Sequence, residues 1–462
     1  MTDNKQRIHS TGNYKLERIE VVALPTEENK GEDRFDITNS VLSFDYFENI
    51  LEPSVSVRMV VANQISLIDA IPIRGGEKVD FSISTGNGVF EPTDKLEFYV
   101  YKVSDVQAED LKETFVMDLV TKDCLSNETT RCQRKYQRLN IADHVKSILD
   151  DVLVTENYSD VNIEKTANSY TFIGCNKKPF HTLRWLSPKS VPTSEGPKGT
   201  SGNDTTAEAR GTAGFFFYEN REGYNFKSLD NLVSKTGIGS ADEKQVWDYE
   251  YTGVVQSGQI IGHTGPIINF SYEKNMDLRK SLRIGMYRNH TIFYDALANE
   301  FRVIDYKLKQ KSKGNRISDF FSKKDKKEVQ EIVNTLNENK DALESQYELY
   351  GQGSSRLLTR ISDHGTLESG LGDKDSGADP TDMAKSFSRY NLLFTQALNI
   401  LVPCNIDLKV GDIIACKFPE RNTDNQSMSG NYLIRELRHH FVMNQNVTSL
   451  KLMRDSYGDR VL

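Results

Sequence analysis

The sequence predicts a mainly β fold of the α+β class: two similar antiparallel β-barrel domains, an α/β domain, and a helical and loop insertion. Short runs rich in Val, Ile, Tyr and Phe, separated by Gly, Pro, Asn and Asp, fill both ends of the chain. A helical period replaces them in between. The chain has 462 residues, which exceeds one ordinary core and predicts several domains. The expected ranges are 1–125 for the first barrel, 126–240 for the α/β domain with a disordered loop at 187–213, 241–310 and 387–462 for the second barrel, and 311–386 for the insertion.

The first barrel is expected from the strand-like residues that follow Tyr14 and end near Val120. One run alternates cleanly, with Val55, Val57 and Met59 on one face. Closely spaced short strands with turn residues between them are typical of a small antiparallel barrel or sandwich. The clearest strands span 54–61, 96–103 and 114–120.

The α/β domain is expected from a change of period. Residues 140–153 (NIADHVKSILDDVL) place apolar side chains on one stripe, with Asn140 as the N-cap, which predicts an amphipathic helix. A second short helix follows Pro179. Two strands, 214–218 and 224–226, then flank a turn. The loop before them consists almost entirely of small and polar residues, which cannot form a hydrophobic core.

The second barrel is expected from strand-like runs on both sides of the insertion. Within the insertion, residues 326–350 show a heptad-like spacing of apolar residues. This helix either pairs with a symmetry mate or lies on its own subunit. Residues 351–382, rich in Gly and Asp, are expected to form a mobile loop. The strand-like runs span 246–255, 267–272, 301–308, 399–402, 413–418, 432–442 and 448–453.

Charge and composition exclude several classes of protein. The 58 basic and 66 acidic residues give a net charge of −8, which argues against sequence-specific nucleic-acid binding. The basic cluster Lys323–Lys327 is interrupted by Asp325 and is read as a solvated helix start. No run of about 18 apolar residues occurs, so no membrane insertion is expected. Five cysteines without a CxxC pair predict free, mostly buried thiols and assembly in the host cytoplasm.

The sequence offers no pattern for catalysis. Its Gly-containing stretches lie between strands without a following helix, so they do not form phosphate-binding loops. His439 and His440 are neighbours in a strand, which directs them to opposite faces rather than to one metal ion. We therefore expect no catalytic, cofactor-binding or metal-binding residues, no cofactor, and no enzymatic activity.

Several segments, taken in order, resemble the central baseplate hub proteins of contractile-tailed phages, which adapt a tail tube to a spike and are related to the hub part of secretion-system spike proteins. The first segment is ITNSVLSFDYFENILEPSVSVRMVVAN from Ile37, followed by GEKVDFSI from Gly76. The middle segments are YQRLNIADHVKSILDDVL, NKKPFHTLRWLSPKS and GFFFYENREGYNFKSLDNL. The last are NILVPCNIDLKVGDIIACKFP, GNYLIRELRHHF and TSLKLMRDSYG. The similarity extends over residues 14–458, apart from 187–213 and 311–386.

The resemblance marks structural positions rather than chemical ones. Gly411, before the strand at Ile413, and Gly430, before Tyr432, are expected in turns because of backbone geometry. The family-matching positions are Phe44, Glu48, Pro53, Pro179, Gly223, Gly411, Asp412, Gly430, Tyr432 and Arg454.

The resemblance implies a structural hub subunit of a baseplate in the virion. In that family three subunits with two barrels each form a pseudo-hexameric ring that joins the hexameric tail tube to a trimeric spike and encloses the central channel. The implied partners are two further copies of the chain, the tail tube protein ring and a separate spike protein, with baseplate wedge proteins and the tape measure protein as further partners.

Three other interpretations stay open on sequence alone. The chain is also compatible with the hub of a phage-derived secretion or injection system. A virion-associated glycan-cleaving hydrolase would need paired carboxylates in a cleft. An unrelated all-β carbohydrate-binding adhesin would bind glycans as a stable monomer.

Overall fold

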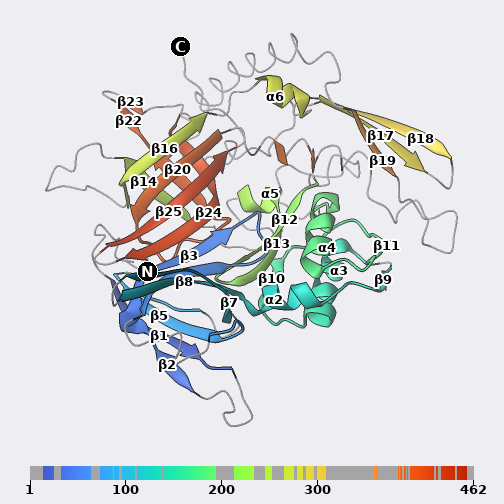
Figure 1. The fold of residues 1–462 in the computed structure, drawn as a ribbon. Helices are drawn as coiled ribbons and strands as arrows, with labels where there is room; N and C mark the ends of the chain where they lie inside the picture. Colours follow the sequence, from blue (N-terminus) through green and yellow to red (C-terminus); the bar gives the residue numbers. More distant parts are fainter. Residues whose placement is uncertain are drawn as a thin grey trace, which may run out of the picture.

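The mainly β class is confirmed, since strands dominate the protein, while the helices between residues 122 and 186 lie together on one side of it (Figure 1). The predictions for the basic cluster at 323–327 and the helix at 326–350 lie outside the described residues, as do 194–212 of the loop predicted at 187–213, and 351–356 and 362–382 of the loop predicted at 351–382. In their described parts the two loop predictions are wrong. Ser187–Lys189 form a 3-10 turn whose Ser187 hydroxyl donates to the carbonyl of Leu183, and Leu357–Ile361 form a strand that pairs with residues 290–294. The computed structural model describes residues 14–24, 33–63, 73–86, 88–92, 96–109, 112–137, 139–193, 213–233, 245–251, 265–274, 278–284, 288–295, 299–307, 357–361, 383, 386–387, 390–391, 393, 396–420, 423–424, 428–442 and 445–454.

The N-terminal half is built from β-strands whose alternation was visible in the sequence. Val55, Val57 and Met59 are buried, whereas Arg58 between them is exposed. The strands are β1 (Tyr14–Val22), β2 (Arg34–Asp36), β3 (Val41–Asn49), β4 (Ser56–Asn63), β5 (Lys78–Thr85), β6 (Gly88–Phe90), β7 (Phe98–Glu109) and β8 (Lys112–Thr121), with a 3-10 turn, η1 (Thr38–Ser40), before β3.

The middle of the chain has its own hydrophobic core, as expected for an α/β unit. The predicted helices are α3, which continues as a π-helix, and α4, which begins at Pro179; the predicted hairpin is β12–β13. Strand β12 is buried on both faces because Phe215 and Phe217 enter this core, while Phe216 and Tyr218 enter the large core of the β halves. The elements are α2 (Lys122–Thr129), β9 (Lys135–Tyr136), α3 (Ile141–Ile148), η2 (Leu149–Leu153), β10 (Tyr158–Ile163), β11 (Phe172–Ile173), α4 (Pro179–Leu186), η3 (Ser187–Lys189), β12 (Phe215–Asn220), β13 (Gly223–Ser228) and α5 (Leu229–Val233).

The C-terminal half contributes the remaining strands of the large sheet. They are β14 (Val246–Tyr251), β15 (Gly265–Ile267), β16 (Asn269–Lys274), β20 (Gln396–Pro403), β21 (Ile413–Lys417), β24 (Gly430–Val442) and β25 (Gln445–Arg454). Outside this sheet lie α6 (Leu278–Arg283), β17 (Arg288–Asp295), β18 (Glu300–Lys307), β19 (Leu357–Ile361), β22 (Pro419–Glu420) and β23 (Thr423–Asp424).

One strand does not lie where the sequence suggested. The run at 301–308 was expected in the second barrel, but β18 joins β17 and β19 in a separate three-stranded sheet. Figure 1 shows this sheet projecting from the rest of the protein. Phe301 and Val303 of β18 are exposed, so this strand does not have a covered face on that side. Alternation of side chains identifies a strand but does not say which sheet it joins.

The two β halves share the same order of strand pairing. Counted along the chain, the six main strands are β1, β3, β4, β5, β7 and β8 in the first half, and β14, β16, β20, β21, β24 and β25 in the second. In each half the second strand pairs with the third, the third with the sixth, the sixth with the fifth, the fifth with the fourth, and the fourth with the first. They differ in direction, because β1 is antiparallel to β5 whereas β14 is parallel to β21.

Local details repeat with the pairing order. The fifth strand of each half carries a bulge at the same place, at Tyr101 in β7 and at Arg435 in β24. At the residue before each bulge, the Gly76 N–H donates to the carbonyl of Val100 over 2.7 Å, and the Gly411 N–H donates to the carbonyl of Ile434 over 3.2 Å. Both glycines have positive φ, +99° and +93°. Each half is therefore one version of the same β module, down to a bulge and a glycine turn.

The modules are joined edge to edge. Strand β3 of the first module pairs antiparallel with β24 of the second, so a single sheet runs through both (Figure 1). One large hydrophobic core also extends across both modules. No closed barrel is detected among the described strands, and the two-barrel architecture stays a prediction.

Candidate functional site

The pairing of β3 with β24, called the seam below, brings together residues almost 400 positions apart in the chain. It runs from Ser43 opposite Val442 to Asn49 opposite Glu436. Asp45, which is buried, accepts hydrogen bonds from Nε and Nη2 of Arg438 over 2.8 and 3.0 Å. His440 Nδ1 lies 2.5 Å from the same carboxylate. A bidentate ion pair thus fixes the register of the seam from its outward face.

The two adjacent histidines of β24 point to opposite faces, which confirms the expectation from the sequence. His440 is half-buried beside Asp45, whereas His439 is buried and shares a 2.9 Å hydrogen bond with Thr448. Burial lowers the pKa of His439 to about 3. His439 is therefore a neutral core residue at any ordinary pH.

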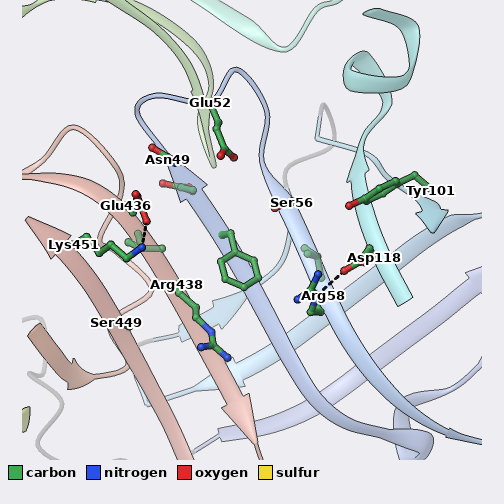
Figure 2. A pocket seen from close by; sticks show the side chains of 14 residues that line it. Asn49, Glu52, Ser56, Arg58, Tyr101, Asp118, Glu436, Arg438, Ser449 and Lys451 are labelled. Carbon is green, nitrogen blue, oxygen red and sulfur yellow. Dashed lines mark hydrogen bonds and ion pairs between the residues drawn. The ribbon is translucent and has the colours of Figure 1, made fainter. Parts of the chain in front are cut away.

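The outward face of the seam carries a shallow depression with a volume of about 440 Å³. Figure 2 shows its charged side chains arranged across neighbouring strands. Asp118 accepts a hydrogen bond from Arg58 over 2.7 Å, and Lys451 lies 2.6 Å from Glu436. Because these two carboxylates are matched with cations, the face carries charges of both signs rather than only acidic ones.

Beneath the seam, a buried carboxylate links three parts of the chain. Glu48 Oε1 accepts from the Tyr46 hydroxyl over 2.9 Å and from the backbone N–H of Arg221 over 2.7 Å. Its Oε2 accepts from the backbone N–H of Val410 over 2.9 Å. Burial raises the pKa of Glu48 to about 7. The side chain of Glu48 therefore holds the β12–β13 turn and the loop before β21 against β3.

A second buried carboxylate makes an equivalent link nearby. Glu219 Oε2 accepts from the backbone N–H of Val55 and from the hydroxyl of Thr121, over 2.9 and 3.0 Å. Its Oε1 accepts from the side-chain amide of Asn157 over 2.7 Å. Burial raises the pKa of Glu219 to about 8. We call Glu48, Glu219 and their donors the junction, since they join the middle domain to both β modules.

Four of the family-matching positions meet at or beside the junction. Glu48 is its centre, and Gly223 begins the strand that follows the Arg221 turn. Gly411 and Asp412 follow Val410, the other donor to Glu48. A Cβ on Gly411 would lie 2.6 Å from the hydroxyl oxygen of Tyr218. Asp412 is half-buried, and its desolvation raises its pKa to about 6.

The other six positions lie elsewhere. Phe44 is in the large core, 4.8 Å from the ring of Phe81 between centroids. Pro53 is in the turn between β3 and β4, and Pro179 is the first residue of α4. Gly430, Tyr432 and Arg454 form a separate group: a Cβ on Gly430 would lie 2.7 Å from Nη1 of Arg454, whose guanidinium carbon lies 5.3 Å from the centre of the Tyr432 ring.

Sequence reasoning missed Glu219, Asn157 and the Asp45–Arg438 pair. A buried acid and a surface acid look alike in a sequence, and the partners are far apart in the chain. The one available signal was the Gly that follows the Glu219 turn at position 223, because a glycine there indicates close backbone packing.

The junction makes stability depend on pH. In the folded protein Glu219 keeps its proton to about pH 8, whereas an ordinary glutamate has a pKa of 4.5. The stabilising contribution of a raised acid is fully present below pH 4.5 and is lost as the pH rises toward 8. We expect the stability difference between the wild type and Glu219→Gln to shift against the wild type by up to about 1.4 kcal/mol per pH unit across this window. Urea unfolding at several pH values between 4.5 and 8.5 measures this difference. If the free energies of unfolding of the two proteins changed in parallel with pH, the raised pKa of Glu219 would be contradicted.

Among the described residues, no group of three or more His, Cys, Asp or Glu side chains could hold a metal ion. The five cysteines are free; three are buried, Cys124 is half-buried and Cys175 is exposed. Within the same residues, no helix combines the length and the apolar character needed to cross a membrane.

Neither a protein-family model nor a curated protein matches the sequence. The chain is similar in structure to the 43 kDa tail protein of prophage MuSo2 from Shewanella oneidensis, with a TM-score of 0.50 and 7% identity over 96% of this chain and 98% of that one. It is also similar to a tail protein from Neisseria meningitidis MC58, with a TM-score of 0.48 and 10% identity over 96% and 98%. A third is prophage tail protein gp18 from Listeria monocytogenes EGD-e, with a TM-score of 0.43 and 10% identity over 96% of each chain. The MuSo2 likeness confirms, at the level of the fold, the resemblance to tail proteins that the sequence motifs indicate.

Proposed function

We propose that the chain is a structural hub subunit of a contractile-tail baseplate. Three copies form a pseudo-hexameric ring around a central channel, and the ring joins a hexameric tail tube to a trimeric spike. The fold shared with a prophage tail protein supports this role over nearly the full length of both chains.

The repeated β module carries the proposal. One chain contains the same six-strand pairing order twice, with the bulge and the glycine turn at the same positions. Three such chains supply six alike modules, so that a three-fold ring presents a nearly six-fold face. A protein with this symmetry can contact a six-fold ring on one side and a three-fold spike on the other without a change of conformation.

The chemistry of the seam and junction supports a structural role as well. The buried carboxylates Glu48 and Glu219 accept hydrogen bonds from backbone donors, and Asp45 is matched by Arg438. Groups held in this way stabilise contacts between parts of the chain. The location that follows is the virion, with the tail tube protein, a separate spike, wedge proteins and the tape measure protein as partners.

The mass of the purified full-length chain in solution tests the ring. Native mass spectrometry is expected to give three times the mass of the chain, because two modules per copy require three copies to complete six. A dimer, or a species that stays monomeric at every concentration, would contradict the proposal.

A further inference from the structure

Two strand edges of the large sheet, one in each β module, have no strand beside them among the described residues. Strand β7 pairs with β5 only at Phe98 and Tyr99, so its opposite edge from Lys102 onward faces no described strand. Strand β16 pairs with β20 along one edge, and the described residues supply no strand for the other edge of 269–274. Long unpaired edges template pairing with another chain unless something covers them.

The equivalents of these two edges pair with each other inside the chain. Strand β24, the counterpart of β7, uses residues 430–433 to pair with β21 and residues 436–442 to pair with β3. Strand β7 uses residues 98–99 for β5, the counterpart of β21, and then bulges at the same place as β24. Beyond the bulge, β7 has no described strand at the edge where β24 pairs with β3.

Strand β16 is the counterpart of β3 by sequence as well as by pairing. Both contain a Phe-x-Tyr motif, at Phe44 in β3 and Phe270 in β16. Phe44 lies opposite Met59, which lies opposite Met117 of β8. Phe270 lies opposite Ile400, which lies opposite Leu450 of β25. The two strands therefore hold the same place in their modules.

We infer that β16 of one copy pairs antiparallel with β7 of the next copy and reproduces the seam between subunits. This inference rests on the proposed ring and gives it a register. In the seam, Arg438 lies opposite Phe47 and Leu437 opposite Glu48. By position in the module, Ser104 and Val103 of β7 correspond to Arg438 and Leu437 of β24, and Glu273 and Lys274 of β16 correspond to Phe47 and Glu48 of β3. The same register therefore places Ser104 opposite Glu273, and Val103 opposite Lys274, of the neighbouring copy.

The register of the seam can be applied to β7 only as far as Ser104, because β7 bulges again between Ser104 and Gln107, where β24 is regular. The two edges belong to different modules, so the contact is head-to-tail, and such contacts generate rings when the rotation closes. The seam inside each chain then alternates with an equivalent seam between chains around the ring.

Cysteine cross-linking of the full-length chain tests this register. The matched pairs are Ser104→Cys with Glu273→Cys, and Val103→Cys with Lys274→Cys, both in a Cys175→Ser background because Cys175 is exposed. Adjacent antiparallel pairs alternate between wider and closer spacing, so at least one matched pair is close enough for a disulfide. The shifted pairs, Ser104→Cys with Lys274→Cys and Val103→Cys with Glu273→Cys, place the two cysteines on opposite faces of the sheet. Mild oxidation should give at least about fivefold more cross-linked trimer for a matched pair than for either shifted pair.

The outcomes separate the register from the ring. Each variant must first show the wild-type mass under reducing conditions, which establishes that it folds and assembles. A wild-type trimer whose matched pairs cross-link no better than the shifted ones overturns the inference and leaves the ring intact. Matched cross-links that build an open ladder beyond three copies support the strand pairing but overturn the trimeric ring. A monomer without cross-links overturns both.

Discussion

Replacing Glu48 by glutamine is expected to cost about 2–4 kcal/mol of folding free energy, because a buried backbone donor loses its acceptor. One carboxylate oxygen accepts from the Tyr46 hydroxyl and the Arg221 N–H, and the other accepts from the Val410 N–H. Whichever way a glutamine amide is turned, its NH₂ group faces a backbone N–H. The loss falls on the contact between the middle domain and both β modules.

The matched control is Glu219→Gln. One oxygen of Glu219 accepts from Val55 and Thr121, and the other accepts from the side-chain amide of Asn157. That amide can turn over and accept from a glutamine NH₂, so this variant should lose less than about 1 kcal/mol at neutral pH. Urea unfolding of both variants measures the difference, and equal losses would show that Glu48 does not hold the junction through its backbone donors.

The second large effect is expected at Gly223, where alanine should cost about 3–5 kcal/mol. Its φ of +105° is unfavourable for any residue with a side chain. A Cβ would also lie 2.4 Å from the carbonyl oxygen of Asn157, which accepts a hydrogen bond from the Tyr224 N–H over 2.8 Å. The backbone that delivers Asn157 to Glu219 would have to move.

Gly75→Ala separates the two causes. Gly75 has a φ of +99°, but the nearest atom to a Cβ there is the carbonyl oxygen of Val100 at 3.8 Å. This variant carries the backbone strain without the clash and should cost only about 1–2 kcal/mol. Thermal unfolding of the two variants decides the point: similar losses would mean that the close approach to Asn157 contributes nothing.

The local structure of this protein was readable from its sequence where burial has a period. The alternation at Val55, Val57 and Met59 and the helical stripe from Ile141 both describe one face of one element, and the structure has both. The glycine at 411 also carried its own information, because its turn requires a positive φ.

What the sequence did not reveal depends on contacts between distant segments. The seam joins β3 to β24 by backbone hydrogen bonds, which leave no pattern of their own in side chains. Glu219 resembles any acidic residue of a hairpin until its donors Val55 and Asn157 are known. The separate sheet of β17, β18 and β19 was missed for the same reason, because alternation of side chains identifies a strand but not the strands it pairs with.

Two similar β domains were predicted from the sequence, but which strand of one corresponds to which strand of the other became visible only through pairing. The turns at Gly76 and Gly411 belong to short matching texts, GEKV and GDII, which are too brief to identify a repeat alone. The shared pairing order and the matching bulges show that these two short sequences occupy equivalent places in the two modules. A direction change of the first strand, antiparallel in one module and parallel in the other, further separates the two sequences.

Electron microscopy of the purified assembly in end-on view tests the central claim most directly. The account predicts a three-fold ring whose annulus shows six similar lobes of density around a channel, with the two lobes of each chain related by about 60° of rotation. A ring with three lobes, or six lobes of two unrelated shapes, would contradict the claim that each chain contributes two copies of one module.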